Sequence, residues 1–195
     1  TTCSKELKKV IDCQLKEPRE EQNLRAQIPC IAPIKNEISQ TVRDQYEENP
    51  YPVWVKPHMY AEAKAVRQVL LESLLNLEGL EGEPPLNPEI LIAGSGTGHH
   101  AIQTSSRFKN AHLLAVDLSL SSLSFALRKT QEYHISNINY MQCDILDLKN
   151  LGKEFDIIES RGVLHHLADP IAGWRVLIDI LRPNGLMKIG LYSKI

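Results

Sequence analysis

The chain has 195 residues, of which 43% are hydrophobic and 24% are charged, and its formal net charge is −2. This composition excludes a disordered chain, and the length predicts one domain with an extension and a substantial core. There is no basic excess that would favour nucleic acid or an anionic membrane surface, and no apolar stretch approaches the roughly 18–20 residues of a membrane span.

The first 50 residues are polar and predict an irregular N-terminal arm or cap. Residues 5–15 have weak helical character, and Pro18, Pro29 and Pro33 are expected to break any longer element. We therefore expect this arm to lie outside the core.

An apolar stripe predicts the next helix, from about Pro57 to Leu77. Pro57 suits the first turn of a helix, and Gly79 suits the position just after its end. A loop rich in proline and glycine is expected over residues 79–88.

After this loop the pattern alternates between strands and helices. Helices are expected after Gly98, after Ser119 or Ser121, and after the pair Asp169-Pro170, in which an N-cap precedes a proline at the first helical position. Strands joined by helices predict right-handed crossovers and a doubly wound, mostly parallel α/β sheet that is buried on both faces. The expected strands cover residues 90–93, 113–117, 138–143, 155–160 and 186–191.

The last of these strands follows a turn at Pro183-Asn184-Gly185 and is strongly apolar. A doubly wound sheet should not end with such a strand as its uncovered edge. The pattern therefore predicts that sequence is missing at the C-terminus, or that a partner such as a second copy in a homodimer covers this edge.

Glycines at positions 94, 96 and 98 follow the first strand, and Asp117 closes the second. Glycines let the backbone approach a ligand, and the acid accepts hydrogen bonds from ribose hydroxyls. A dinucleotide fingerprint would require Gly or Ala at position 99, where this chain has His99. The spacing Gly-x-Gly-x-Gly therefore favours S-adenosylmethionine, which has no pyrophosphate to place on the helix N-terminus, over NAD.

Other candidate cofactor residues stand at the carboxyl ends of the strands, where open α/β sheets bind their ligands. Leu118 could pack on the adenine ring, Ile145 could cover it, and Asp144 could either accept from the adenine amino group or cap a helix. Ser95 and Ser160 are also candidates, because they belong to the segments after the first and fourth strands.

The aromatic segment 46–54 predicts either an ordered loop or a lid across the cofactor. In the lid interpretation Tyr46 and Tyr51 face the site, where aromatic rings attract a sulfonium. We therefore include Tyr51 among the cofactor-binding residues.

Methyl transfer from a sulfonium needs in-line alignment, and it needs a base only if the nucleophile arrives protonated. Glu159 and His165, beside the fourth strand, are the candidate catalytic residues, with His166 adjacent; either histidine can equally be a packing residue. His99 and His100 lack the i, i+4 spacing of a metal pair, so a helix-face or cofactor-edge role is expected.

No metal site is predicted. The cysteines form no Cys-x-x-Cys pair and match no zinc-binding spacing. Free thiols are typical of a reducing compartment, so we expect a cytoplasmic protein. The cysteines are Cys3, Cys13, Cys30 and Cys143.

Residues from about 50 to 192 resemble class I S-adenosylmethionine-dependent methyltransferases. The segments that carry the resemblance are 89–98, Ala115–Ser119, Gln142–Ile145, Phe155–Leu167 and Leu181–Met187. The resemblance implies a Rossmann-like sheet with strand order 3-2-1-4-5, whose sixth and seventh strands are absent from this chain. It also implies cofactor contacts at the residues already singled out, namely Gly94, Gly96, Gly98, Asp117, Leu118, Asp144 and Ile145.

We accordingly expect an N-terminal arm or cap over residues 1–50 and a methyltransferase core, truncated at its C-terminus, over 51–195. Ile92 departs from the family pattern, because many members have an acid two residues before the first glycine, where it meets the amino group of the methionine moiety. The segments Asp44–Trp54, Leu91–His100 and Met187–Ser193 are similar to bacterial methyltransferases fused behind tetratricopeptide repeats, which implies such repeats upstream.

The leading interpretation is a methyltransferase that acts on a small molecule or a protein side chain, with no nucleic-acid or membrane partner expected. A non-catalytic module that binds S-adenosylmethionine or S-adenosylhomocysteine is one alternative. An NAD-dependent oxidoreductase is the other, and His99 argues against it.

Overall fold

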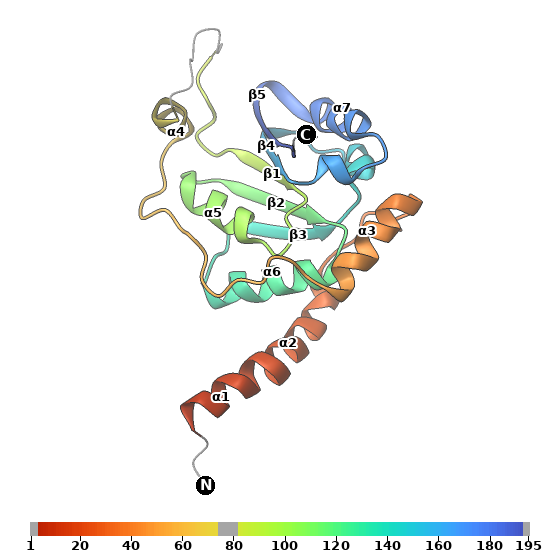
Figure 1. The fold of residues 1–195 in the computed structure, drawn as a ribbon. Helices are drawn as coiled ribbons and strands as arrows, with labels where there is room; N and C mark the ends of the chain where they lie inside the picture. The colour runs from red at the N-terminus through yellow and green to blue at the C-terminus, as the bar shows by residue number, and fades with distance from the viewer. Residues whose placement is uncertain (1–3, 74–81, 193–195) are drawn as a thin grey trace.

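The computed structural model describes residues 4–73 and 82–192. Five parallel strands form one sheet in the order β3-β2-β1-β4-β5, as the sequence predicted (Figure 1). This is the Rossmann-like, doubly wound arrangement. Strands β2 and β3 are added on one side of β1, and β4 and β5 on the other, so the strand order reverses between the neighbouring strands β1 and β4. The strands are β1 (Glu89–Ala93), β2 (His112–Asp117), β3 (Ile138–Gln142), β4 (Phe155–Arg161) and β5 (Leu181–Gly190).

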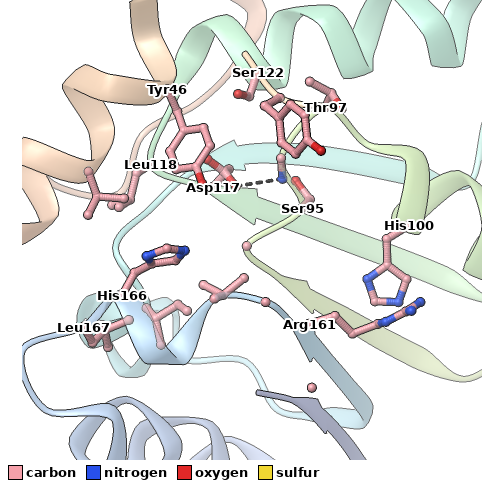
Figure 2. A pocket seen from close by; sticks show the side chains of 18 of the residues that line it. Tyr46, Ser95, Thr97, His100, Asp117, Leu118, Ser122, Arg161, His166 and Leu167 are labelled. Atoms are coloured by element: carbon pink, nitrogen blue, oxygen red, sulfur yellow. Dashed lines mark hydrogen bonds between the residues drawn. The ribbon is translucent and has the colours of Figure 1, made fainter. Parts of the chain in front are cut away.

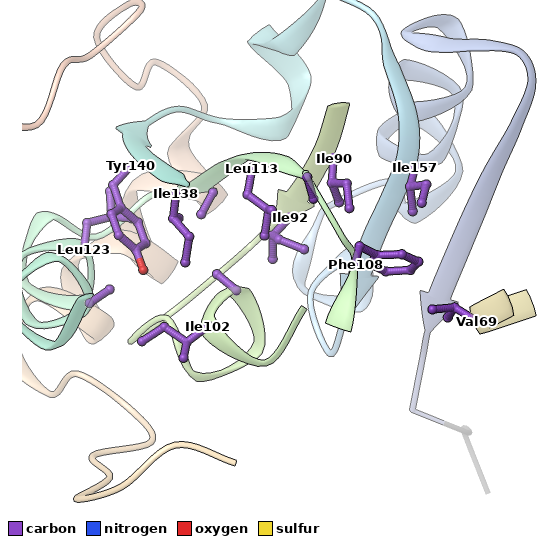
Figure 3. Close-up of a cluster of buried hydrophobic side chains, with 14 of the residues drawn as sticks. Val69, Ile90, Ile92, Ile102, Phe108, Leu113, Leu123, Ile138, Tyr140 and Ile157 are labelled. Atoms are coloured by element: carbon purple, nitrogen blue, oxygen red, sulfur yellow. The ribbon is translucent and has the colours of Figure 1, made fainter. Parts of the chain in front are cut away.

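Helices cover both faces of the sheet (Figure 1). Helices α5 (His99–Arg107) and α6 (Leu120–Glu132) cover one face, and the 3-10 helix η3 (Ile145–Leu151) with α7 (Pro170–Asp179) covers the other. Alternate side chains of a strand point to opposite faces, so Ile90 and Ile92 join the core under α5 and α6, which Figure 3 shows. Leu91 and Ala93 join the core on the other face.

Two helix starts follow the predicted capping residues. Ser119 accepts a hydrogen bond from the backbone N–H of Ser122 at the start of α6. Asp169 accepts from Ile171 and Ala172 at the start of α7, with Pro170 in the first turn. These contacts satisfy N–H groups that have no partner inside the helix.

The N-terminal arm is helical rather than irregular, which corrects the sequence prediction. Helix α1 (Lys5–Ile11) continues through a π-helical turn (Asp12–Lys16) into α2 (Glu17–Leu24) and a 3-10 turn (Arg25–Gln27), and α1 extends away from the sheet (Figure 1). Pro18 does not break this run, because the wider π turn ahead of it relieves the clash that a proline ring has with a preceding carbonyl. Pro29 and Pro33 do lie in irregular chain before α3 (Glu37–Glu48).

The helix predicted over 57–77 is also shorter than expected. Helix α4 covers Val66–Glu72, and Pro57 lies in irregular chain ahead of it. Lys64 instead forms a β-bridge with Phe108, its N–H donating to the carbonyl of Arg107, and this extended backbone prevents a helix from starting earlier. The predicted end, Leu77 and Gly79, lies outside the described residues.

The turn predicted at residues 183–185 lies inside β5 rather than before it. Leu181 pairs with Phe155, and the next register pair is Leu186 with Ile157, so the intervening residues form a bulge with Asn184 at φ 61°. Strand β5 consequently begins five residues earlier than the sequence suggested. No helix in residues 4–73 and 82–192 is long and apolar enough to cross a membrane.

Candidate active site

A cavity of about 680 Å³ lies at the carboxyl ends of the strands, between the loop after β1 and the ends of β4 and β5 (Figure 2). Helix α3 and residues 51–52 form its roof. Its position at the point where the strand order reverses is the usual ligand site of open α/β sheets, and its size suits a small-molecule ligand.

Most of the sequence-predicted cofactor residues line this cavity, but the predicted catalytic residues do not. The predicted residues that line it are Tyr51, Gly94, Ser95, Gly96, Asp117, Leu118, Asp144 and Ile145. Those outside its lining are Gly98, Ser160, Glu159 and His165.

Close packing requires glycine at two positions of the loop after β1. A Cβ atom on Gly94 would stand 2.3 Å from Val163 Cγ2, and one on Gly98 would stand 2.5 Å from Ala126 Cβ. Both residues have positive φ, at 77° and 81°. Gly98 therefore lets α5 approach α6, and this packing role explains why it lies outside the cavity lining.

Asp117 connects the glycine loop to the start of α6. Its Oδ2 accepts from the N–H of Gly96 at 2.7 Å, and its Oδ1 accepts from the N–H of Ser119 at 3.0 Å. Burial raises the pKa of the Asp117 carboxyl, although these backbone N–H groups oppose the change. Each carboxylate oxygen keeps capacity for a second hydrogen bond from a ligand.

The residues after β3 are held by a local cap. Asp144 accepts from the N–H of Leu146 at 3.0 Å and so begins η3, while it also lines the cavity. Its two roles, cap and cavity residue, are therefore compatible. Ile145 is buried in the core beneath.

Two hydroxyl groups in the cavity have no hydrogen-bond partner among the residues that the structure describes. They belong to Ser95, in the glycine loop, and to Ser122, in the first turn of α6, and both oxygens are buried. Buried polar atoms are nearly always satisfied in proteins. A polar ligand would satisfy both, and sequence reasoning had missed Ser122, because nothing in the sequence of a helix indicates which serine faces a ligand.

The roof of the cavity is attached to the glycine loop. Thr97 Oγ1 donates to the carbonyl of Pro52, and Trp54 Nε1 donates to the carbonyl of Thr97 at 3.1 Å. Tyr46 and Tyr51 both line the cavity, as expected, and Tyr51 remains 72% exposed. Burial raises the pKa of Tyr46, with the nearby Asp117 carboxylate acting in the same direction.

Glu159 lies behind the cavity wall rather than in it. Its Oε2 accepts from His100 Nε2 at 2.7 Å and from Thr104 Oγ1 at 2.8 Å. Burial alone would raise the pKa of Glu159, but the hydrogen bond and charge of His100 outweigh it and lower the pKa to about 2. The carboxylate is thus engaged with His100, which stands in the first turn of α5 and lines the cavity.

The two histidines after β4 differ in their surroundings. His166 lines the cavity, whereas the ring of His165 stands between those of His166 and Tyr192, with centroids 4.2 Å and 4.5 Å away. Neither ring nitrogen of His165 has a partner in the described chain, and burial lowers its pKa. The tight 3-10 turn Leu164–His166 turns successive side chains in different directions, so the sequence could not distinguish the two.

Comparison with known families gives the site a context. Residues 90–185 match the family model described as a methyltransferase domain. This segment is similar to methyltransferase domains. Its boundaries enclose β1 to the bulge of β5, and therefore the glycine loop, Asp117 and Asp144.

Curated relatives of this chain include an uncharacterized protein from Synechococcus, 36% identical over 109 residues that make up 55% of this chain and 26% of the relative. Phosphoethanolamine N-methyltransferase 2 from Caenorhabditis elegans is 30% identical over 54% of this chain and 24% of its own length. The chain thus spans about a quarter of the length of these relatives.

Solved structures share the fold of this chain. Phosphoethanolamine N-methyltransferase 2 from Haemonchus contortus, in complex with phosphomonomethylethanolamine and S-adenosylhomocysteine, is 22% identical with a TM-score of 0.54, over 81% of this chain and 36% of its own. The [4+2]-cyclase SpnF is 18% identical with a TM-score of 0.55, over 77% of this chain and 59% of its own. Because these two proteins carry different activities, the shared fold alone does not assign one.

Proposed function

We propose that this chain is an S-adenosylmethionine-dependent methyltransferase whose acceptor is a small molecule or a protein side chain. One observation carries the proposal. Within a segment that matches a methyltransferase-domain model, one cavity is lined by Asp117 and by the hydroxyls of Ser95 and Ser122, which have no partner in the described part of the chain. Leaving buried polar groups without partners costs about 1–3 kcal/mol each, and a ribosyl cofactor with several hydroxyl and amine groups would remove that cost.

In this proposal the chain holds the donor by groups of matched chemistry. Asp117 accepts from the ribose hydroxyls, Asp144 accepts from the adenine amino group, and Leu118 and Ile145 pack against the ring. When bound, S-adenosylmethionine supplies a methyl group on a sulfonium. The cavity walls hold donor and acceptor in line and exclude water. Of Glu159, His165 and His166, only His166 borders the cavity and could act as a base there.

The test is a comparison of ligands by calorimetry. We expect the chain to bind S-adenosylmethionine and S-adenosylhomocysteine, and not NAD. The variant Asp117→Asn should weaken both by about tenfold or more, because an amide loses one of the acceptors that the ribose hydroxyls require. The variant Asp147→Asn, in η3 and outside the cavity lining, is the control. Tighter binding of NAD, or no binding of S-adenosylmethionine and S-adenosylhomocysteine, would refute the proposal.

A second candidate, a module that binds the cofactor without catalysis, is favoured by one observation. Ile92 stands where many related enzymes have an acid, and it is fully buried in the core. Transfer of a labelled methyl group from S-adenosylmethionine to any member of a panel of amines, carboxylates and phenols would exclude this candidate.

We further infer the wider organisation from the sequence: the resemblance implies upstream tetratricopeptide repeats, the apolar last strand suggests a homodimer, and the free cysteines favour the cytoplasm. Upstream tetratricopeptide repeats, a homodimer and a cytoplasmic location remain predictions. Sedimentation of the chain over a range of concentrations tests the homodimer directly.

A further inference from the structure

The charged groups of the cavity are segregated along the edge of the sheet. Asp117 and Asp144 follow β2 and β3, whereas Arg161 and His100 line the opposite end, at β4 and α5 (Figure 2). The strand order β3-β2-β1-β4-β5 separates the two groups by the glycine loop after β1. A ligand that fits this cavity has hydrogen-bond donors at one end and negative charge at the other.

Strand geometry brings Arg161 and His100 together. Glu159 and Arg161 are two residues apart on β4 and therefore project from the same face of the sheet, roughly 7 Å apart. Since the Glu159 carboxylate holds His100 Nε2 at 2.7 Å, His100 lies next to the Arg161 position. With Nε2 engaged, His100 retains Nδ1 for a ligand, and the Arg161 guanidinium offers five donors.

Positive groups outnumber negative ones at this end. Glu159 faces His100, Arg107 Nη1 at 3.7 Å, and Lys188, its register partner on β5. Within residues 4–73 and 82–192 no aspartate or glutamate forms an ion pair with Arg161. An anionic ligand would reduce this excess of positive charge, and a guanidinium matches a planar carboxylate by two parallel hydrogen bonds.

We propose that Arg161 and His100 form a carboxylate-binding subsite at the β4 end of the cavity. The proposal rests on the proposed function, because it assigns one end of the same cavity. Two sources could supply the carboxylate: the methionine moiety of the donor, or the methyl acceptor. If the donor supplies the carboxylate, this subsite anchors its methionine moiety. Such an anchor would be needed because Ile92 stands on β1 where many related enzymes have an acid that binds the amino group of this moiety.

The experiment compares two ligands that differ by the amino-acid tail. S-adenosylhomocysteine carries the carboxylate, and 5′-methylthioadenosine lacks the whole tail. Binding of each to the wild-type chain, Arg161→Gln and Arg161→Lys is measured by calorimetry, with Arg175→Gln, an exposed arginine on α7, as the matched control. Malonate, a small dicarboxylate, is then titrated into the chain saturated with S-adenosylhomocysteine.

A donor carboxylate is supported if Arg161→Gln weakens S-adenosylhomocysteine by about 10- to 100-fold, the range for a charge-assisted hydrogen bond, and leaves 5′-methylthioadenosine unchanged. Arg161→Lys should then recover part of the affinity. An acceptor carboxylate is supported if Arg161→Gln leaves both nucleosides unchanged but abolishes malonate binding.

Two results overturn the subsite: equal weakening of both nucleosides in Arg161→Gln, or unchanged binding of both nucleosides and of malonate. Failure of the proposed function has a different signature. In that case the wild-type chain binds neither nucleoside, and malonate titrated into the free chain reports on the subsite alone. Malonate binding that is lost in Arg161→Gln supports the subsite. If the wild-type chain does not bind malonate either, the subsite is overturned too.

Discussion

At the scale of single residues, Glu159 is a buried charged group just behind the cavity wall, and its pKa is lowered in the folded chain. It is 3% exposed, yet its carboxylate is ionised because His100 and Thr104 bond to it and Arg107 lies nearby. A buried carboxylate with such partners stabilises the folded chain only while it keeps its charge. The consequence is a dependence of stability on pH.

We expect the free energy of unfolding to decrease as the pH falls from about 4.5 to about 2. The pKa of Glu159 is lowered in the folded chain from 4.5 to about 2, so its contribution is complete above the unfolded value and is lost through this window. The variant Glu159→Gln should be less stable at pH 7 and show a shallower decrease on acidification. Urea unfolding at several pH values measures both, with Asp179→Asn, an exposed residue, as the control. Parallel curves for wild type and Glu159→Gln would contradict this.

The residues that the sequence predicted well are those at strand ends. Asp117, Leu118 and Asp144 line the cavity because carboxyl ends of parallel strands meet at one edge, and a strand end can be read from the apolar run before it. The choice between His165 and His166 depended on the direction of a 3-10 turn. That direction comes from packing against Tyr192, which the local sequence does not encode.

At the scale of elements, the roof of the cavity depends on a few contacts with the glycine loop. Backbone carbonyls supply part of the attachment, since Pro52 accepts from Thr97. The Tyr51 side chain is largely exposed and does not support the fold. Its contribution can therefore be tested without disturbing the roof.

We expect Tyr51→Ala to weaken S-adenosylmethionine several-fold, and to weaken it more than S-adenosylhomocysteine. Cation–π attraction is worth on the order of 1 kcal/mol and acts only on the charged sulfonium. Tyr51→Phe keeps the ring and should bind both as the wild type does. Calorimetry with the two ligands measures the difference, and an unchanged affinity in Tyr51→Ala would refute the lid.

The helices and strands were predicted to different degrees. Strands β1 to β4 and helices α5, α6 and α7 followed from periodicity and from caps such as Ser119 and Asp169. The late start of α4 did not, because it depends on the bridge between Lys64 and Phe108, residues far apart in sequence. The helical run through Pro18 was missed for a related reason: a π turn has no reliable sequence signal.

At the scale of the whole molecule, the N-terminal helices are joined to the core by charge pairs. Arg128 on α6, with its side chain 6% exposed, contacts Glu17 at 2.9 Å and Glu21 at 2.8 Å on α2. Farther along, Glu47 of α3 accepts from the N–H groups of Leu120 and Ser121 and so caps α6. The alternation of strands and helices predicted a parallel sheet, and the family resemblance implied its order. The pairings of Arg128 and Glu47 join residues more than seventy positions apart, beyond any local pattern.

We expect Arg128→Gln to lower the free energy of unfolding by about 1–3 kcal/mol, less than for a fully buried pair because both glutamates are partly exposed. The double variant Glu17→Gln with Glu21→Gln should have a larger effect, since it leaves the buried Arg128 charge with only Glu132, at 3.5 Å, as a partner. Combining all three changes tests the coupling in urea unfolding. Strict additivity of the three changes would mean that the charges do not interact.

The crowding around Gly94 and Gly98 limits what a mutational scan of the glycine loop can report. A single added methyl at either position would push against Val163 or Ala126 before any ligand arrives. Variants there would misfold or distort, so a loss of affinity in them says nothing about which atoms touch the nucleoside. Gly96 is less crowded, because an added methyl would meet only the carbonyl of Tyr51, at 3.4 Å, although its φ of 51° still strains an L side chain. Of the three glycines, Gly96 is the position where a change in ligand affinity reports most directly on contact with the ligand.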